Sequence, residues 1–186
     1  MITVAVSLIL LLFLACFGFY WDSREKDWTT STGSTFVMDT FVDQKFSGKQ
    51  SGLAVEKINE LLKNFENRFS AYVSSSEISR INQNAGLSYI QVSEETFDFL
   101  KTAKEYCKRS QGLFDITIGP LVDLWDNTGE NPRVPDEREI QSVLKRVNYE
   151  DLLLREEDHS VMLRQEGQKL NLGGMAKGTA GALAIE

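Results

Sequence analysis

The first charged residue of the chain is Asp22, so residues 1–21 form an uninterrupted uncharged segment dominated by Leu, Ile, Val, Phe and Ala. A helix of about 20 apolar residues is long enough to span a bilayer. Residues 13–16 read Phe-Leu-Ala-Cys, which approximates the site where bacterial lipoproteins are cleaved and acylated. No Lys or Arg precedes the apolar run, so a signal peptide ending at Cys16 and an uncleaved anchor both stay open. Either alternative predicts a body that is exported or tethered to the membrane.

The rest of the chain has 165 residues (186 minus 21), which suits one folded domain with its own core. It carries every charged side chain, so its net charge is −7. An acidic body argues against nucleic acid as a partner and against a basic surface that docks on a membrane. Cys107 is the only other cysteine and lies on a predicted helix, which favours a buried hydrophobe over a nucleophile. With His159 as the only histidine, a zinc site is not expected.

Apolar residues at helical spacing predict three longer helices. The first begins near Leu53 and carries one stripe of Ile58, Leu61, Leu62, Phe65 and Phe69. The second covers residues 93–110, with Phe97, Leu100, Ala103 and Cys107 on one side. The third follows Asp136 as its N-cap and turns Ile140, Val143, Leu144 and Val147 inward. The serine cluster at 74–76 predicts an N-cap and a further short helix.

Strands are predicted in the segments between these helices. Residues 22–34 are polar and suit a tether, and residues 35–46 are rich in Phe, Val and Thr and read as a strand. Residues 112–118 are strand-like at their centre, with a turn at Gly119-Pro120, and residues 152–154 and 161–163 predict a hairpin around His159. The expected class is therefore α+β, a sheet with helices packed on it.

Residues 170–178 read Leu-Asn-Leu-Gly-Gly-Met-Ala-Lys-Gly. Two apolar residues around Asn171, followed by glycines and Lys177, suggest a strand that ends in an anion-binding turn, with a helix after Gly178. The order Lys177-Gly178-Thr179 differs from the Gly-Lys-Thr of a Walker A loop, and the motif lacks G-x-G-x-x-G. Taken alone, the motif fits an ordinary strand-to-helix turn better than a phosphate site.

Four stretches in order carry a resemblance to a known family. They are Met38-Asp39-Thr40, residues 69–82 with Phe-Ser-Ala-Tyr and Ser-Glu-Ile-Ser-Arg-Ile-Asn, residues 112–125 with Gly-Leu-Phe-Asp and Gly-Pro-Leu, and residues 172–178. Together they resemble the FAD:protein FMN transferase family, also called ApbE-like, whose members were formerly known as thiamine biosynthesis lipoproteins. The resemblance covers nearly all of the chain from Thr35 onward.

This resemblance implies a Mg²⁺-dependent enzyme on the outer face of the cell membrane, lipid-anchored through Cys16. Such an enzyme transfers the FMN moiety of FAD to a threonine hydroxyl of an acceptor electron-transfer flavoprotein and releases AMP. The positions that match place the following residues around FAD: Met38, Tyr72, Leu113, Phe114, Asp115, Asn171 and Lys177. They make the backbone carbonyl of Gly174 a metal ligand, and they assign no general base. Each of these residues also has a structural reading as core, cap or solvated side chain.

Departures from the family pattern keep two other functions open. Asn171 stands where the family usually has Asp, so it can hydrogen-bond but cannot act as a carboxylate. Members of the family run to roughly twice this length, within the range of one larger domain. Residues 35–186 are thus expected to be the N-terminal part of an incomplete domain that is poorly stable and inactive alone. The alternatives are a flavin-binding lipoprotein without transferase activity, or hydrolysis of FAD to FMN and AMP.

Overall fold

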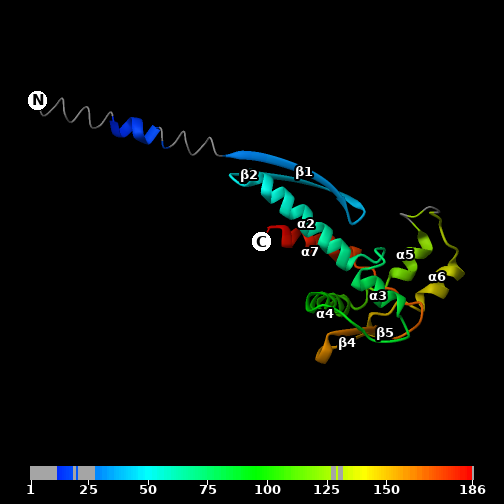
Figure 1. Cartoon of the computed structure of the whole chain (residues 1–186). Coiled ribbons are helices and arrows are strands. Elements are labelled where there is room, and N and C mark those ends of the chain that lie inside the picture. The colour runs from blue at the N-terminus through cyan, green and yellow to red at the C-terminus, as the bar shows by residue number, and fades with distance from the viewer. Residues whose placement is uncertain (1–11, 19, 21–27, 127–128, 130–131, 186) are drawn as a thin grey trace, which may run out of the picture. The chain divides into compact units, whose positions relative to one another are not determined.

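The computed structural model describes residues 12–18, 20, 28–126, 129 and 132–185 (Figure 1). The chain divides into two compact units, residues 1–60 and 61–186. Residues 12–18 and 20 are helical and exposed, while most of the predicted anchor at 1–21 lies outside the described residues. In the part of the chain that is described, no helix combines the length and apolar character that a membrane span requires.

The first unit contains an antiparallel hairpin of β1 (Thr29–Val37) and β2 (Thr40–Gly48), followed by the start of helix α2 (Ser51–Phe69). Strand β1 begins inside the segment predicted to be a tether, of which residues 22–27 are not described. The single strand predicted over residues 35–46 is wrong, because Met38 and Asp39 form a two-residue turn within it. Their φ angles of 53° and 55° match a type I′ turn, whose twist fits a hairpin.

Glycine and small polar residues join the hairpin to the beginning of α2. A methyl group added at Gly33 would lie 2.5 Å from Cγ1 of Val55, so only glycine permits this close approach of strand and helix. Nε2 of Gln44 donates to Oδ1 of Asn59 at 2.7 Å, and the hydroxyls of Ser31 and Ser51 lie 2.9 Å apart. These contacts hold the hairpin against the first turns of α2 within the first unit.

The second unit combines helices with a three-stranded antiparallel sheet in the order β3-β5-β4. Its elements after α2 are α3 (Glu77–Gln83), β3 (Ile90–Gln91), α4 (Glu94–Arg109), α5 (Gly119–Trp125), α6 (Glu137–Leu144), the 3₁₀ turn η1 (Tyr149–Asp151), β4 (Leu152–Arg155), the 3₁₀ turn η2 (Glu156–Asp158), β5 (Ser160–Leu163) and α7 (Gly173–Ile185). The predicted hairpin around His159 is confirmed, with Leu152 opposite Leu163 and Arg155 opposite Ser160. His159 adopts the left-handed conformation, with φ 49°, that closes the turn.

Helix α4 lies beside the β4–β5 hairpin and supplies much of the core (Figure 1). It follows Ser93 as N-cap and buries the predicted stripe of Phe97, Leu100, Ala103 and Cys107. Burial raises the pKa of the Cys107 thiol, which fits a packed hydrophobe. The rest of this core includes Ile78, Ile81, Ile116, Leu152, Val161, Leu163, Leu170 and Leu172. The predicted α+β class, with helices packed on a small sheet, is thereby confirmed.

Three local predictions are wrong. Residues 113–117 form a loop, and Ile118 makes only an isolated parallel bridge to Lys169. Gly119 and Pro120 begin helix α5 rather than a turn, since proline is well tolerated in a first helical turn. Helix α7 begins at Gly173, before the predicted start after Gly178, and the residues preceding it are not a strand.

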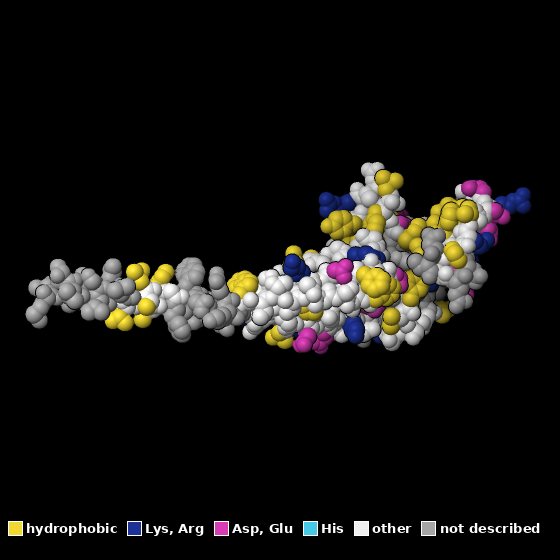
Figure 2. Space-filling model, turned by 90° about the horizontal axis from the view of Figure 1, so that it is seen from above, with side chains coloured by type: hydrophobic (Ala, Val, Ile, Leu, Met, Phe, Trp, Pro, Cys, Tyr) yellow, Lys and Arg dark blue, Asp and Glu magenta, His cyan; other side chains and the backbone are white. Residues whose placement is uncertain are grey.

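Helix α6 has the predicted N-cap and only part of the predicted packing. Asp136 accepts hydrogen bonds from the N–H groups of Arg138 and Glu139, and Glu139 completes a capping box. No residue of α6 is fully buried, however, and Leu144 is 39% exposed. Figure 2 shows hydrophobic side chains interspersed with charged ones on the face in view. Ile140, Val143 and Val147 are half-buried, so the predicted inward face is confirmed in part and fails at Leu144.

Candidate functional site

The first turn of α7 is positioned by the short segment that precedes it. Residues 168–172 alternate, because Gln168, Leu170 and Leu172 are buried while Lys169 and Asn171 are half-buried. Asn82 of α3 clamps the backbone of Leu170: its Oδ1 accepts from the N–H at 2.7 Å, and its Nδ2 donates to the carbonyl at 3.1 Å. The alternation directs the side chain of Asn171 away from the buried leucines.

The side chain of Asn171 joins the start of α7 to a distant tyrosine. Its Oδ1 accepts a hydrogen bond from the N–H of Gly173 at 2.9 Å, which satisfies one donor of the helix N-terminus. Its Nδ2 donates to the hydroxyl of Tyr72 at 3.4 Å. Tyr72 is 54% exposed. Two residues predicted to bind FAD are thus in contact although 99 positions separate them.

Phe114 and Gly174 form a second contact at the same helix start. A methyl group at Gly174 would lie 3.0 Å from Cε2 of Phe114, so glycine lets the ring approach the helix backbone closely. Both residues line a groove of about 720 Å³ between α4 and α7, which is walled by Phe99, Tyr106 and Met175 as well. A mainly apolar groove of this size suits a ring-containing cofactor.

Lys177 lies one turn further along α7 and is exposed. Gly173, Gly174 and Gly178 are exposed at neighbouring positions of the same helix, so no side chain larger than hydrogen stands beside Lys177 at these positions. A helix N-terminus carries a partial positive charge, and a lysine near it adds to the attraction for an anion. This end of α7 therefore presents positive potential beside an apolar groove.

Leu113 and Asp115 flank Phe114 but differ from it in their surroundings. Leu113 is 95% exposed. Oδ1 of Asp115 accepts from the N–H and the hydroxyl of Thr117 at 2.7 and 2.6 Å, and Oδ2 accepts from the N–H of Tyr149 at 2.9 Å. The carboxylate thus ties the 113–117 loop to η1 and holds Phe114 in place. Contact of Leu113 and Asp115 with FAD stays a prediction.

Met38 belongs to the first unit, where it forms the β1–β2 turn with Asp39. A positive φ at a residue other than glycine is uncommon and is enriched at functional positions. Contact of Met38 with FAD stays a prediction.

The metal site predicted at Gly174 is not completed by the described residues. They contain no group of three or more His, Cys, Asp or Glu side chains that could hold a metal ion. Gly174 lies in the first turn of α7 and would supply one carbonyl oxygen, whereas Mg²⁺ requires an octahedral set of ligands. The described residues alone therefore do not fit a magnesium site, and the role of Gly174 stays a prediction.

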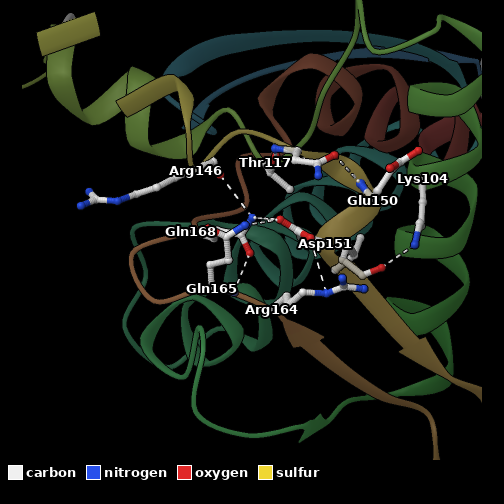
Figure 3. A network of polar contacts seen from close by, with 10 residues as sticks. Lys104, Thr117, Arg146, Glu150, Asp151, Arg164, Gln165 and Gln168 are labelled. Carbon is white, nitrogen blue, oxygen red and sulfur yellow. Dashed lines mark hydrogen bonds and ion pairs between the residues drawn. The ribbon is translucent and has the colours of Figure 1, made fainter. Parts of the chain in front are cut away.

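A buried polar network holds the segment that leads to the site (Figure 3). Asp151 is 5% exposed, and its Oδ2 accepts from Nε2 of Gln165 at 2.7 Å and from Nε2 of Gln168 at 3.0 Å. Arg164 Nε lies 3.5 Å from Oδ1 of the same carboxylate. Nearby, Lys104 donates to the carbonyl of Leu152 at 2.5 Å, and burial lowers the pKa of its ammonium. Because a buried carboxylate is costly unless paired, this network fixes the chain up to Lys169.

Three residues at the site were not predicted from the sequence: Asn82, Asp123 and Lys169. Lys169 Nζ lies 2.6 Å from Oδ2 of Asp123 and 5.4 Å from the centre of the Tyr72 ring. The alternation of polar and apolar residues at 168–172 is a sequence signal that places Lys169 and Asn171 on one side. No comparable signal points to Asp123, whose approach depends on how α5 packs.

Fold and site together define an α+β domain with a nucleotide-sized apolar groove beside a glycine-rich helix N-terminus. The chain belongs to the ApbE family, whose model matches residues 38–186. The predicted resemblance is thus confirmed.

Relatives and solved structures agree with this assignment. The chain is 32% identical over 145 residues to the FAD:protein FMN transferase of Klebsiella pneumoniae, covering 78% of this chain and 46% of that protein. It is 30% identical over 130 residues to the enzyme of the same name from Treponema pallidum, covering 67% and 36%. The crystal structure of the ApbE protein from Thermotoga maritima superposes with a TM-score of 0.78 at 32% identity, covering 84% of this chain and 51% of that one. The chain thus spans about half or less of the relatives it matches.

Proposed function

We propose that this chain forms part of an FAD:protein FMN transferase, which moves the FMN moiety of FAD to a threonine hydroxyl of an acceptor electron-transfer flavoprotein. One observation carries the proposal: at the start of α7, Asn171 contacts Tyr72 and Gly174 contacts Phe114. These residues come from separate stretches of the sequence, and each was expected at the site on the family pattern. Family membership supports the same reaction.

The residues at this helix end suit the two parts of FAD differently. The aromatic walls around Phe114 offer flat apolar surface to a ring system, and Tyr72 offers a second ring. Lys177 and the partial positive charge at the N-terminus of α7 favour the pyrophosphate. Asn171 donates and accepts hydrogen bonds but cannot take up a proton as a carboxylate would. These residues therefore bind and orient FAD, and the general base is not among them.

The proposed reaction balances without a further reactant. The threonine oxygen forms a bond to the phosphorus on the FMN side of the pyrophosphate, and the bond from that phosphorus to the bridging oxygen breaks. AMP leaves with the bridging oxygen, and the hydroxyl proton is released. Positive charge from Lys177 at the pyrophosphate stabilises the charge that builds up as this bond breaks.

Two finer parts of the proposal rest on the family resemblance. The first is Mg²⁺ dependence, for which the described residues offer only the Gly174 carbonyl, so no step is derived through the metal. The second is attachment to the outer face of the membrane through a lipid on Cys16, which is exposed. Such an anchor would hold the protein beside membrane-bound acceptors.

The experiment combines FAD binding with product analysis on the full-length protein. On titration with FAD, we expect saturable quenching of flavin fluorescence. When Mg²⁺ and membranes of the expressing cells are added, we expect release of AMP and covalently bound flavin on a denaturing gel. EDTA is expected to abolish the second result. Free FMN in place of protein-bound flavin would identify FAD hydrolysis instead, and binding without any AMP would identify a flavin-binding lipoprotein. Absence of FAD binding would overturn the proposal.

A further inference from the structure

Lys169 lies against the ring of Tyr72 and is held there by an acidic partner. Its Nζ is 5.4 Å from the ring centre, which is within the range of a cation–π contact. The same Nζ lies 2.6 Å from Oδ2 of Asp123 on α5, and the lysine side chain is 27% exposed. The lysine is thus in contact with both the tyrosine and the aspartate.

The backbone at Lys169 is fixed on both sides. Its neighbours Gln168 and Leu170 are 1% and 0% exposed. The N–H of Gly119 donates to the carbonyl of Lys169 at 3.0 Å, and a methyl group at Gly119 would lie 2.5 Å from that oxygen. Because these contacts fix the orientation of the backbone at Lys169, the lysine side chain is directed toward Asp123 and Tyr72.

We propose that Lys169, held by Asp123, is a positioning residue that orients the Tyr72 ring for contact with the aromatic ring system of a nucleotide. The proposal rests on the proposed function, in which Tyr72 meets FAD. Lys169 contacts the ring while Asn171 holds the hydroxyl at 3.4 Å, so the two contacts fix its tilt and its rotation. Asp123 neutralises the ammonium, so Lys169 acts through the tyrosine rather than by attracting phosphate.

The experiment is a double-mutant cycle on the full-length protein, read out as the Kd for FAD from fluorescence quenching. Lys169→Met removes the charge and keeps the length of the side chain. Lys169→Arg keeps the cation, and the groove of about 390 Å³ lined by Lys169, Asp123 and Ala71 has room for a guanidinium. The matched control is Lys101→Met, which breaks an ion pair of similar length, 2.7 Å to Glu156, between α4 and η2.

Lys169→Met is expected to raise the Kd roughly 2- to 5-fold, the effect of one exposed cation–π contact, with Lys169→Arg restoring most of the affinity. Lys101→Met should leave the Kd unchanged. In a Tyr72→Leu background, Lys169→Met should have no further effect, because the tyrosine through which it acts is gone. An equal effect of Lys169→Met in both backgrounds, or none in either, would overturn the proposal.

A second readout separates this proposal from the proposed function. In the ligand-free protein, Lys169→Met should shift the NMR signals of the Tyr72 ring, whereas Lys101→Met should not. If the wild-type protein fails to bind FAD, the proposed function falls, and these ring signals still decide whether the lysine orients the tyrosine. Unchanged ring signals in Lys169→Met would contradict the proposal that Lys169 orients Tyr72, whether or not the protein binds FAD.

Discussion

The amide of Asn171 connects two parts of the second unit by donating from Nδ2 to the Tyr72 hydroxyl at 3.4 Å and accepting at Oδ1 from the Gly173 N–H at 2.9 Å. The same side chain therefore caps the N-terminus of helix α7 and holds the hydroxyl of a tyrosine 99 positions away. The resemblance described above leads one to expect Asp at this position, and Asp also caps helices well. The amide nitrogen of Asn171, however, donates a hydrogen bond to the Tyr72 hydroxyl, which an ionised carboxylate could not do.

Replacement of this amide should separate its two roles. Asn171→Ala loses the cap and should lower the free energy of unfolding by about 1 kcal/mol, as well as weakening FAD binding. Asn171→Asp keeps the cap and should leave stability within about 0.5 kcal/mol of wild type, since an acidic residue favours a helix N-terminus. Thermal unfolding and FAD titration check both variants. Equal loss of stability in the two variants would show that capping is not the role of Asn171.

Gly174 and Gly178 offer a matched comparison on α7. Alanine is favoured over glycine in a helix by about 0.8–1.0 kcal/mol, and a methyl group at Gly178 meets nothing within 4 Å, so Gly178→Ala should stabilise. At Gly174 the methyl group would lie 3.0 Å from Phe114, so the ring must shift and Gly174→Ala should gain less. FAD affinity should fall for Gly174→Ala. An identical effect of both variants on stability and affinity would contradict the contact with Phe114.

Stability should depend on pH through Glu77. Burial raises the pKa of this carboxyl, but hydrogen bonds from Thr96 and Ser93 outweigh it and hold the pKa below its usual 4.5. A folded-state pKa below the unfolded one adds stability above about pH 4.5, which is lost as the pH falls through the folded value. Urea unfolding between pH 3 and 7 should therefore show a free energy of unfolding that falls toward acid pH, and this fall should be smaller in Glu77→Gln. The same pH dependence in Glu77→Gln as in the wild type would disprove the contribution of Glu77.

Lys177 should matter for FAD and not for folding. Lys177→Ala is expected to raise the Kd for FAD roughly 10-fold, the size of a hydrogen bond to a charged group, and to reduce its salt dependence. Unfolding should be unaffected because the side chain is exposed. Lys101→Ala, another exposed lysine on a helix, serves as the control. Equal Kd values for Lys177→Ala and the control would remove Lys177 from the site.

Asp115 is expected to act mainly on stability. Asp115→Ala leaves the N–H groups of Thr117 and Tyr149 without their acceptor, which should cost about 1–3 kcal/mol of unfolding free energy. In the protein that remains folded, the FAD affinity should change less than the stability does. A large loss of affinity at normal stability would instead support the direct contact with FAD that the resemblance implies.

Some of the fold and part of the site followed from the sequence alone because the signals are local. The apolar stripe of α4, the caps at Ser76 and Asp136, and the β4–β5 hairpin depend on side chains within a few positions of one another. The family pattern likewise singled out Tyr72, Phe114 and Asn171. A repeat of 3.6 residues, or a serine before a helix, carries its meaning without the rest of the chain.

Tertiary structure decided what depends on distant partners. Residues 113–117 are strand-like in composition but form a loop, because Asp115 binds Thr117 and the N–H of Tyr149 from beyond the next two helices. The pairing of Asn171 with Tyr72, and of Lys169 with Asp123, likewise joins residues whose spacing gives no sign of contact. The sequence by itself determined the longer helices α2 and α4, the β4–β5 hairpin and the family of the chain. Only packing determined which side chains meet at α7, because a contact between distant residues is set by the whole core and not by either residue's neighbours.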